Sequence, residues 1–486
     1  MNPRAILHVF GTLLLVTGVA MLLPVVCALF YPEDGDFGAL LSGAAITCGL
    51  GFPLWFLFRG HTDLGTRDAI FIAAFGWVVI SAVSALPFVF EGSIPDFSSA
   101  FFEMMSGYTT TGATTLSDIE AVPHGLLFWR SLTHLLGGMG FITLAVFFMP
   151  YGMGGTRMFR AESSPGQVLG HEKFLPRTRD AMSFLWAIYL GLNAIQVVLM
   201  SLGGMPLFES LCHAFGTVST SGYSPLNASI GQYDNAYFDW VIVVFMWLGG
   251  VTFMLFYALL QGDWRTVARN TELRWYVGFT LFFVGGVTLA LWGAGTYGPL
   301  DSLRYSAFQV ISLLTTTGFS TADYEQWSPA AQVLLYVVCF VGACAGSTTS
   351  GIKVIHYVIL WKFLSVAVKK IFFQPLTVLS VRVDGRPVDM LIVYLSMAYF
   401  TVNIVLILLG AIVMSVTDGL DVTSSVSAVI ACLMNIGPGF GDVGPTHNFG
   451  FISPAGKWFL SWTMLVGRLE MFSALVIFYP SFWRGR

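Results

Sequence analysis

Four short stretches of the chain carry one polar pattern, in which a glycine ends a run of mostly hydroxyl-bearing residues. The four glycines are Gly112, Gly222, Gly318 and Gly437. The two residues before each glycine are Thr110 and Thr111, Thr220 and Ser221, Thr316 and Thr317, and Asn435 and Ile436. Such segments are uncharged, and their carbonyl and hydroxyl oxygens can replace the hydration shell of a weakly hydrated monovalent cation, whereas Ca²⁺ favours carboxylates. A glycine at this place permits positive φ, which turns a carbonyl inward where a Cβ would clash.

A single loop of this kind is more often an ordinary Thr-Gly turn that caps a helix. Four copies in one register, each after a short apolar segment, favour a pore in which the loops meet on a pseudo-fourfold axis. Irregular backbone at membrane depth is tolerated only where it is buried in protein or lines a watery cavity. We therefore predict that these twelve residues form one cation site, with the partial negative ends of the preceding half-helices pointing at it.

Helices in a membrane must hold these loops, because the composition lacks the charge to cover a water-facing surface. The chain is 56% hydrophobic and 10% charged with a mean hydropathy of +0.75, whereas soluble proteins carry about 25% charged residues. This excludes soluble enzymes, nucleic-acid-binding proteins and disordered proteins, and the net charge of −4 provides no basic field for nucleic acid. Apolar runs of the length a bilayer needs predict spans at 6–31, 39–58, 69–90, 126–150, 182–203, 237–260, 275–294, 329–361 (interrupted), 390–415 and 456–482.

The spans and loops together predict an all-α polytopic membrane protein. Residues 1–66 would form two helices, and four helix–half-helix–loop–helix repeats would follow at 67–180, 181–272, 273–386 and 387–486. Lysine and arginine gather in alternate connecting segments and at both chain ends, while the other segments are acidic. Because basic loops stay on the cytoplasmic side, we expect both termini to be cytoplasmic.

Two further features lie where they could control passage through such a pore. The interruption of the third repeat's second span reads Gly346, Ser347, Thr348, Thr349, Ser350 and Gly351, with Lys353 two residues later. These are poor helix formers, and their position below the third loop predicts a gate, although a kink at a close helix contact is an alternative.

Arg468 lies in the middle of the last predicted span, where a charge is costly and usually functional. We expect it to face the permeation path and repel passing cations. The alternative is a buried salt bridge. Glu470 is only two residues away and lies off the same helix face, so it could neutralise Lys353 instead.

The whole chain resembles the TrkH/KtrB-type potassium transporters, and their TrkH branch in particular. The resemblance is carried by TTTGAT at 109–114, STSGYSP at 219–225, TTTGFSTADY at 315–324, NIGPGFGDVGP at 435–445, GACAGSTTSGIK at 342–353 and GRLEMF at 467–472. It implies K⁺ uptake across the bacterial inner membrane through a filter of the four loops, with an intramembrane gating loop. It further implies that the two helices of residues 1–66 are peripheral and pack outside the pore. It also implies a homodimer and a cytosolic nucleotide-binding ring of the TrkA type, which could dock on the basic loops 151–180 and 362–388. Asn435 and Ile436 depart from the threonine pattern, so we expect a less symmetric filter.

Other functions remain open on the sequence alone. The transport alternatives are an ion-coupled symporter that moves K⁺ with H⁺ or Na⁺, and a less selective monovalent cation channel. A membrane-embedded enzyme would need a nucleophile–base pair or metal ligands at membrane depth, and the sequence shows no such constellation, so we expect no enzymatic activity. A purely structural scaffold would not explain four loops in register.

Overall fold

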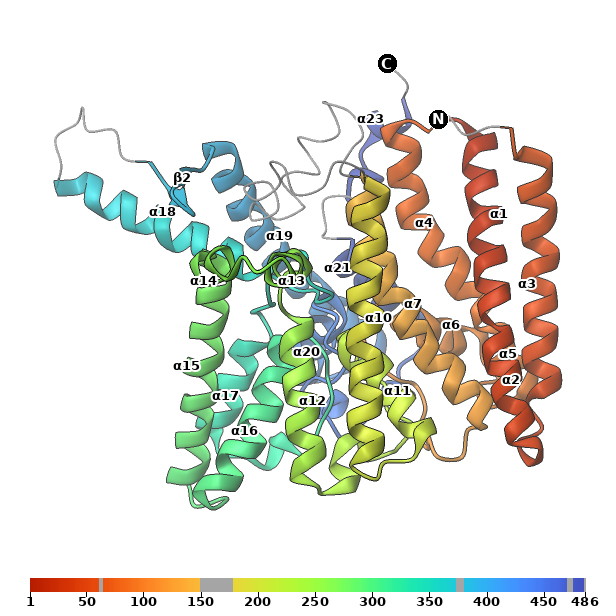
Figure 1. Ribbon diagram of the computed structural model, residues 1–486, viewed down its shortest axis with the longest axis horizontal. Coiled ribbons are helices and arrows are strands. Elements are labelled where there is room, and N and C mark those ends of the chain that lie inside the picture. The colour runs from red at the N-terminus through yellow and green to blue at the C-terminus, as the bar shows by residue number, and fades with distance from the viewer. Residues whose placement is uncertain (61–63, 149–177, 373–379, 470–474, 485–486) are drawn as a thin grey trace.

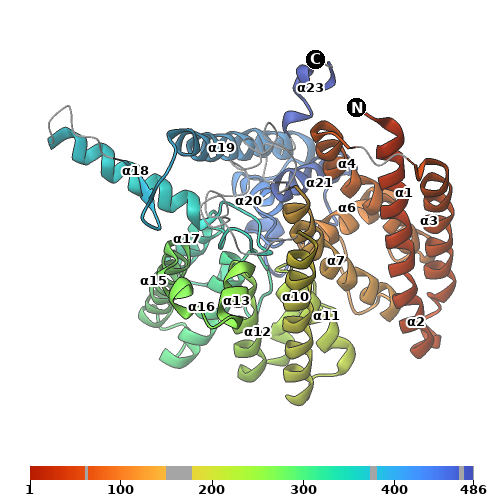
Figure 2. The same cartoon turned by 45° about the horizontal axis from the view of Figure 1, so that its top comes forward.

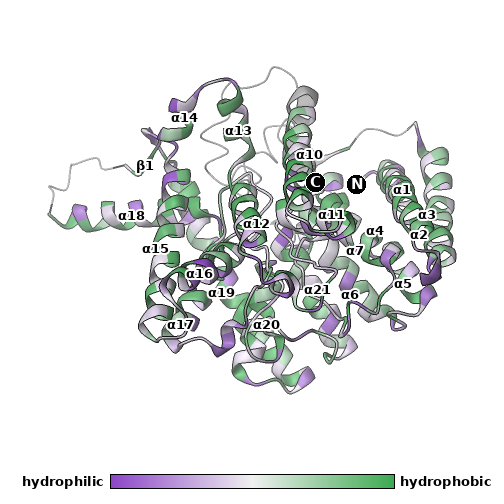
Figure 3. Ribbon diagram, turned by 60° about the horizontal axis from the view of Figure 1, so that its bottom comes forward, coloured by the Kyte–Doolittle hydropathy of each residue, from purple (hydrophilic) through white to green (hydrophobic). Residues whose placement is uncertain are grey.

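The long helices pack side by side as a bundle (Figure 1). The computed structural model describes residues 1–60, 64–148, 178–372, 380–469 and 475–484. In this part of the chain, six helices are long and apolar enough to cross a membrane, and one bent pair of helices would make a seventh span. Hydrophobic residues dominate the long helices, as Figure 3 shows. The predicted all-α fold class is confirmed.

The N-terminal helices stand at one edge of the bundle, beside the rest of the chain (Figures 1 and 2). They are α1 (Pro3–Ala20), α2 (Leu22–Phe30) and α3 (Phe37–Phe58), with a 3₁₀ turn, η1 (Pro32–Asp34), between the last two. The single helix predicted at 6–31 is divided at Met21. α1 approaches α3 closely, since a Cβ on Gly11 would lie 2.4 Å from the backbone nitrogen of Trp55.

Four short helices begin at one end of the bundle and end inside it. They are α6 (Phe97–Tyr108), α11 (Leu207–Val218), α16 (Pro299–Leu314) and α20 (Val422–Leu433). Their lengths are 12, 12, 16 and 12 residues, too short for a hydrocarbon core of about 30 Å. Asp96 and Asp421 cap α6 and α20 through backbone N–H groups of the first turn, and α16 begins with Pro299, which suits that position.

Each short helix lies, in sequence, between two other helices of the bundle. Those before it are α4 (Thr66–Ser84) with α5 (Leu86–Glu91), α10 (Thr178–Leu202), α15 (Thr271–Gly293) and α19 (Met390–Asp418). Those after it are α7 (His124–Phe148), α12 (Ala236–Gly249), α17 (Pro329–Val338) and α21 (Pro454–Arg468). This order follows the predicted sequence of elements, while the boundaries chosen for the repeats stay predictions.

The prediction of one continuous span at 237–260 is wrong. α12 ends at Gly249, and α13 (Phe253–Leu260) continues after a bend of 96°. The backbone groups that the break frees bind another segment: the Cys344 N–H donates to the Gly250 carbonyl at 3.0 Å, and the Phe253 N–H donates to the Gly346 carbonyl at 3.1 Å. Membrane helices break only where such partners exist. α14 (Trp264–Arg269) then leads to α15.

The predicted interruption of 329–361 is confirmed, because α17 ends at Val338 and α18 (Val354–Phe372) begins only after a non-helical segment. α18 projects from the bundle (Figure 2), and β1 (Arg382–Val383) pairs antiparallel with β2 (Arg386–Pro387). The remaining elements are η2 (Ser229–Tyr233), η3 (Tyr324–Gln326), η4 (Gly441–Val443) and α23 (Pro480–Trp483). Arg468 is the last residue of α21 rather than the middle of a helix, and residues 470–474 lie outside the described part of the chain.

Candidate functional site

The four loops that follow the short helices share one backbone conformation. The residue two before the glycine has positive φ in every loop: Thr110 at 53°, Thr220 at 56°, Thr316 at 54° and Asn435 at 54°. The glycines are also positive, at 83°, 79°, 84° and 97° in chain order. Positive φ is a genuine outlier for a β-branched residue and costs about 1–3 kcal/mol. Strain repeated at equivalent positions is typical of a functional site.

The same backbone hydrogen bond holds each loop against its own short helix. The N–H of the residue before the glycine donates to the carbonyl five residues earlier. The pairs are Thr111 to Ser106 at 2.9 Å, Ser221 to Gly216 at 2.9 Å, Thr317 to Ser312 at 2.7 Å, and Ile436 to Ala431 at 2.8 Å. The Asn-Ile loop therefore keeps the backbone of the other three.

The loops meet in a closed ring. A Cβ added to Gly112 would lie 2.1 Å from the carbonyl oxygen of Ser221, and one on Gly222 would lie 2.0 Å from that of Thr317. The corresponding distances are 2.0 Å from Gly318 to the Ile436 oxygen and 2.7 Å from Gly437 to the Thr111 oxygen. Each glycine thus lies against the carbonyl of the next loop, and the fourth lies against the first. The structure brings all twelve predicted residues together, and only a residue without Cβ fits at the glycines.

The fourth loop differs in its side chains. In the other three loops, hydroxyls two residues apart are hydrogen-bonded: Thr109 with Thr111 at 2.8 Å, Ser219 with Ser221 at 2.5 Å, and Thr315 with Thr317 at 2.7 Å. Asn435 instead donates its amide to the Thr111 hydroxyl of the adjacent first loop at 2.8 Å and to the Met464 carbonyl at 3.0 Å. The predicted asymmetry is therefore one of side chains and not of backbone.

A cavity of about 180 Å³, here called the vestibule, opens next to the ring and is lined by all four glycines. Its walls are the segments that follow the glycines, including Ser224 and Asn448. A water molecule needs roughly 10–15 Å³ of such space, so the vestibule has room for several waters around an ion that approaches the ring.

On the other side of the ring lies the segment 342–353, here called the intramembrane loop. Its Thr348 hydroxyl donates to the Val218 carbonyl at 2.9 Å and lies 3.3 Å from the Thr220 hydroxyl. Its Ser350 N–H donates to the Thr316 hydroxyl at 3.1 Å. The structure therefore places the predicted gating residues directly against threonines of the second and third loops.

Two buried, positively charged side chains form hydrogen bonds with the intramembrane loop. Arg468 donates through Nη1 to the Thr348 carbonyl at 2.9 Å and to the Ser350 hydroxyl at 3.2 Å, and through Nη2 to the Gly137 carbonyl on α7 at 3.1 Å. Lys353 donates to the carbonyl and, at 3.2 Å, to the hydroxyl of Thr349. The alternative partner, Glu470, lies outside the described residues. Gly346 and Gly351 have positive φ, at 71° and 74°.

The first half of the intramembrane loop has a partner that sequence reasoning missed. The buried carboxylate of Glu272, in the first turn of α15, accepts the Ala345 N–H at 2.7 Å. The Thr252 hydroxyl at the α12–α13 bend donates to the Ala345 carbonyl at 2.7 Å. The sequence signal for this contact was the position of Glu272, an acidic residue just before the apolar span predicted at 275–294.

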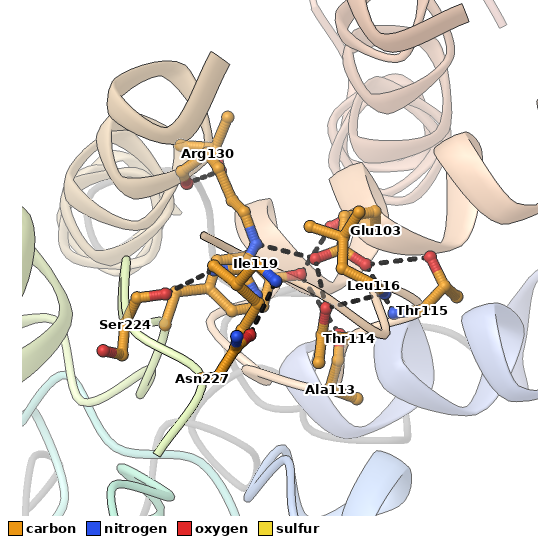
Figure 4. Close-up of polar contacts among 11 residues, drawn as sticks. Glu103, Ala113, Thr114, Thr115, Leu116, Ile119, Arg130, Ser224 and Asn227 are labelled. Atoms are coloured by element: carbon orange, nitrogen blue, oxygen red, sulfur yellow. Dashed lines mark hydrogen bonds and ion pairs between the residues drawn. The ribbon is translucent and has the colours of Figure 1, made fainter. Parts of the chain in front are cut away.

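Behind the ring lies a second group, which Figure 4 shows and of which sequence reasoning missed Arg130. Arg130 on α7 forms an ion pair with Glu103 on α6, with 2.7 Å between Nε and Oε1, and both side chains are buried. Arg130 also donates to the Ser224 carbonyl at 3.0 Å. The sequence signal for Arg130 was its charge inside the predicted span 126–150, because charged residues within membrane spans are rare and usually functional.

The chain is similar to known proteins in sequence and in overall structure. A family model described as TrkH, cation transport protein, matches residues 39–484. The chain is 36% identical over 490 residues to the Trk system potassium uptake protein TrkH of Salmonella typhimurium, with 100% of both chains covered. It is 32% identical over 494 residues to TrkG of Escherichia coli, with 100% of this chain and 99% of that protein covered. The crystal structure of the potassium transporter TrkH from Vibrio parahaemolyticus superposes with a TM-score of 0.89 at 31% identity, covering 100% of both chains.

Proposed function

We propose, from the premise that this chain belongs to the TrkH family of cation transport proteins, that it takes up potassium through the ring of four loops. Potassium uptake is the activity in the names of its full-length relatives. The observation that carries the proposal is the closed ring, in which each glycine lies against the carbonyl of the next loop. No ring residue is acidic. A dehydrated K⁺ would therefore be held by neutral oxygens, which suit a monovalent ion.

The twelve ring residues would act as the selectivity filter. The carbonyls of the two residues before each glycine, and the hydroxyls of Thr111, Ser221 and Thr317, supply the oxygens. The α6, α11, α16 and α20 C-termini end at the ring, so the negative ends of their dipoles stabilise a cation in the adjoining space. This arrangement lowers the cost of dehydrating K⁺ at membrane depth without a fixed negative charge.

The intramembrane loop and Arg468 would form the gate. The loop lies against Thr220 and Thr316, on the side of the ring opposite the vestibule. Passage would require it to leave these threonines and the Arg468 guanidinium. Arg468 would also oppose cation entry by charge repulsion while the loop is closed.

We place the protein in the bacterial inner membrane as a multi-pass protein. The N-terminal residues and α23 lie at the same end of the bundle (Figure 1), and we take that end as cytoplasmic. The helices of residues 1–66 would pack outside the pore, and the repeats would divide at 67–180, 181–272, 273–386 and 387–486. The partners would be a second copy of the chain and a cytosolic ring of the TrkA type.

A flux assay tests the filter. Liposomes with the purified protein would be measured for K⁺, Rb⁺ and Na⁺ flux, for the wild type and Gly222→Ser. The new Cβ would meet the Thr317 carbonyl at 2.0 Å, so we expect the K⁺/Na⁺ flux ratio to fall. Gly295→Ser is the matched control, because Gly295 also has positive φ, at 71°, but has open space around it. An unchanged ratio in Gly222→Ser would refute the filter. A K⁺ current whose reversal potential follows pH or Na⁺ would favour the symporter instead.

A further inference from the structure

The residues that directly follow the first two glycines of the ring are joined by one buried cluster. This cluster consists of Glu103, Arg130 and Tyr223, and we call it the Glu103–Arg130 cluster. Figure 4 shows Glu103 and Arg130. Its ion pair is almost fully buried, with side-chain exposures of 0% for Glu103 and 2% for Arg130. Burying two charges is expensive unless their hydrogen bonds are satisfied. The partners of each charge therefore indicate what the cluster holds in place.

The Glu103 carboxylate holds the first loop. Its Oε1 accepts the Thr114 hydroxyl at 2.9 Å, and its Oε2 accepts the N–H and the hydroxyl of Thr115 at 2.7 and 3.1 Å. Thr114 and Thr115 are the second and third residues after Gly112. The carboxylate thus holds the segment that follows Gly112 against α6.

The Arg130 guanidinium holds the second loop. It donates to the carbonyl of Ser224, the second residue after Gly222. Its Cζ lies 3.4 Å from the ring centroid of Tyr223, which follows Gly222 directly. The Tyr223 hydroxyl then crosses back to the first loop, donating to the carbonyls of Glu103 at 2.8 Å and Ala113 at 3.1 Å. Both loops are therefore bound to the same ion pair.

The second and third repeats have a weaker form of this brace, and the fourth has an alanine at the equivalent position. The residues nine positions before the ring glycines are Glu103, His213, Gln309 and Ala428. His213 Nε2 lies 3.0 Å from the Ser224 hydroxyl, and Gln309 donates to the Ala322 carbonyl at 3.4 Å. Only the first repeat has a charged residue at this position, and it pairs with an arginine of the next helix.

From these contacts we propose that Glu103 and Arg130 are positioning residues that set the ion preference of the ring by fixing the first and second loops relative to each other. The inference rests on the proposed filter. The Gly112–Ser221 contact is the joint between these two loops, and the cluster lies directly behind it. Discrimination of K⁺ from the smaller Na⁺ by cavity size requires an oxygen cage that resists contraction. Charge-assisted hydrogen bonds, which are about twice as strong as neutral ones, supply that stiffness here.

The test measures the K⁺/Na⁺ flux ratio in liposomes, which is a property of each pore and does not depend on how much protein folds. Arg130→Lys keeps the charge but cannot provide both the planar stack on Tyr223 and the bond to Ser224. We expect its ratio to fall by about 10-fold, which corresponds to about 1.4 kcal/mol. The control is the double variant Arg304→Met with Asp239→Asn. It removes another ion pair, between α16 and α12, with 3.4 Å between Arg304 Nε and Asp239 Oδ2, and its ratio should be unchanged.

A double variant, Glu103→Gln with Arg130→Met, separates positioning from charge balance. It leaves no unpaired buried charge, so folding should recover relative to either single change. We expect its ratio to remain low, because the bonds to the Ser224 carbonyl and the Tyr223 ring are gone. A wild-type ratio in both Arg130→Lys and the double variant would overturn the proposal. If Gly222→Ser lowered the ratio while these variants did not, the filter would stand and only the positioning role would fail.

Discussion

Replacing Arg468 separates two ways in which one residue could keep the pore closed. Arg468→Met removes both the charge and the hydrogen bonds to the intramembrane loop, whereas Arg468→Lys keeps the charge and loses the forked guanidinium. Opening the loop must break the two bonds from Nη1, to the Thr348 carbonyl and the Ser350 hydroxyl. The Nη2 bond to Gly137 on α7 does not involve the loop.

The size of the effect follows from these two bonds. A hydrogen bond to a charged group contributes about 1.5 kcal/mol or more, so together they favour the closed loop by about 3 kcal/mol. That free energy corresponds to about a 100-fold shift between closed and open loops. Arg468→Met should therefore increase basal K⁺ flux by up to about 100-fold. Arg468→Lys should give a smaller increase, since a positive charge still faces the entering ion.

The assay is K⁺ efflux from liposomes that hold the purified protein without any partner, normalised to the amount of folded protein. The thermal stability of wild type and of both variants would be measured in detergent alongside the flux. Unchanged flux in Arg468→Met, together with lower stability, would support a purely structural role for this arginine and refute the gate. An increase in Arg468→Met with wild-type flux in Arg468→Lys would show that charge alone closes the pore, and would refute the reasoning from hydrogen bonds.

Two further changes test other contacts. Deleting residues 346–351 removes the part of the intramembrane loop that lies against the ring, so liposome flux should rise; unchanged or abolished flux in a folded protein would contradict a barrier at this place. Burial raises the pKa of the Asp36 carboxyl, whose Oδ2 accepts the Leu126 N–H at 3.1 Å. A raised pKa in the folded state means that wild type loses stability as pH rises through it. Asp36→Asn keeps an acceptor for Leu126 and should raise the Tm near neutral pH, with the gain shrinking as the pH is lowered; a gain that is independent of pH would contradict this cause.

The polar loops were predictable because their signal is local and repeated. A Thr-Gly turn after a short apolar run is ambiguous once, but the same turn four times in register leaves few architectures. The backbone conformation of each loop is determined locally. In every loop, the N–H of the residue before the glycine donates to the carbonyl five residues earlier in the loop's own short helix. Asn435 adopts the same positive φ as Thr110, Thr220 and Thr316. The departure from threonine was therefore a poor guide to the backbone, because the short helix and the glycine determine it.

The bend after α12 was not predictable from its own residues. The stretch 237–260 is mostly apolar, with Asp239 as its one charged residue, and two adjacent glycines in a membrane helix are compatible with a continuous span. The helix breaks because Cys344 and Gly346, about a hundred residues further along the chain, bind the backbone groups that the break frees.

Composition and pattern by themselves determined that this chain is helical, that it resides in lipid, and that four uncharged loops recur between its helices. Each of these properties depends only on residues that are close together in the sequence and on the solvent that surrounds them. Only the tertiary structure decided that Arg468 binds Thr348, and that Arg130 joins the first two loops through Glu103 and Tyr223. The partners in these contacts are distant in sequence, and a buried charge takes whichever partner packing brings within hydrogen-bonding distance.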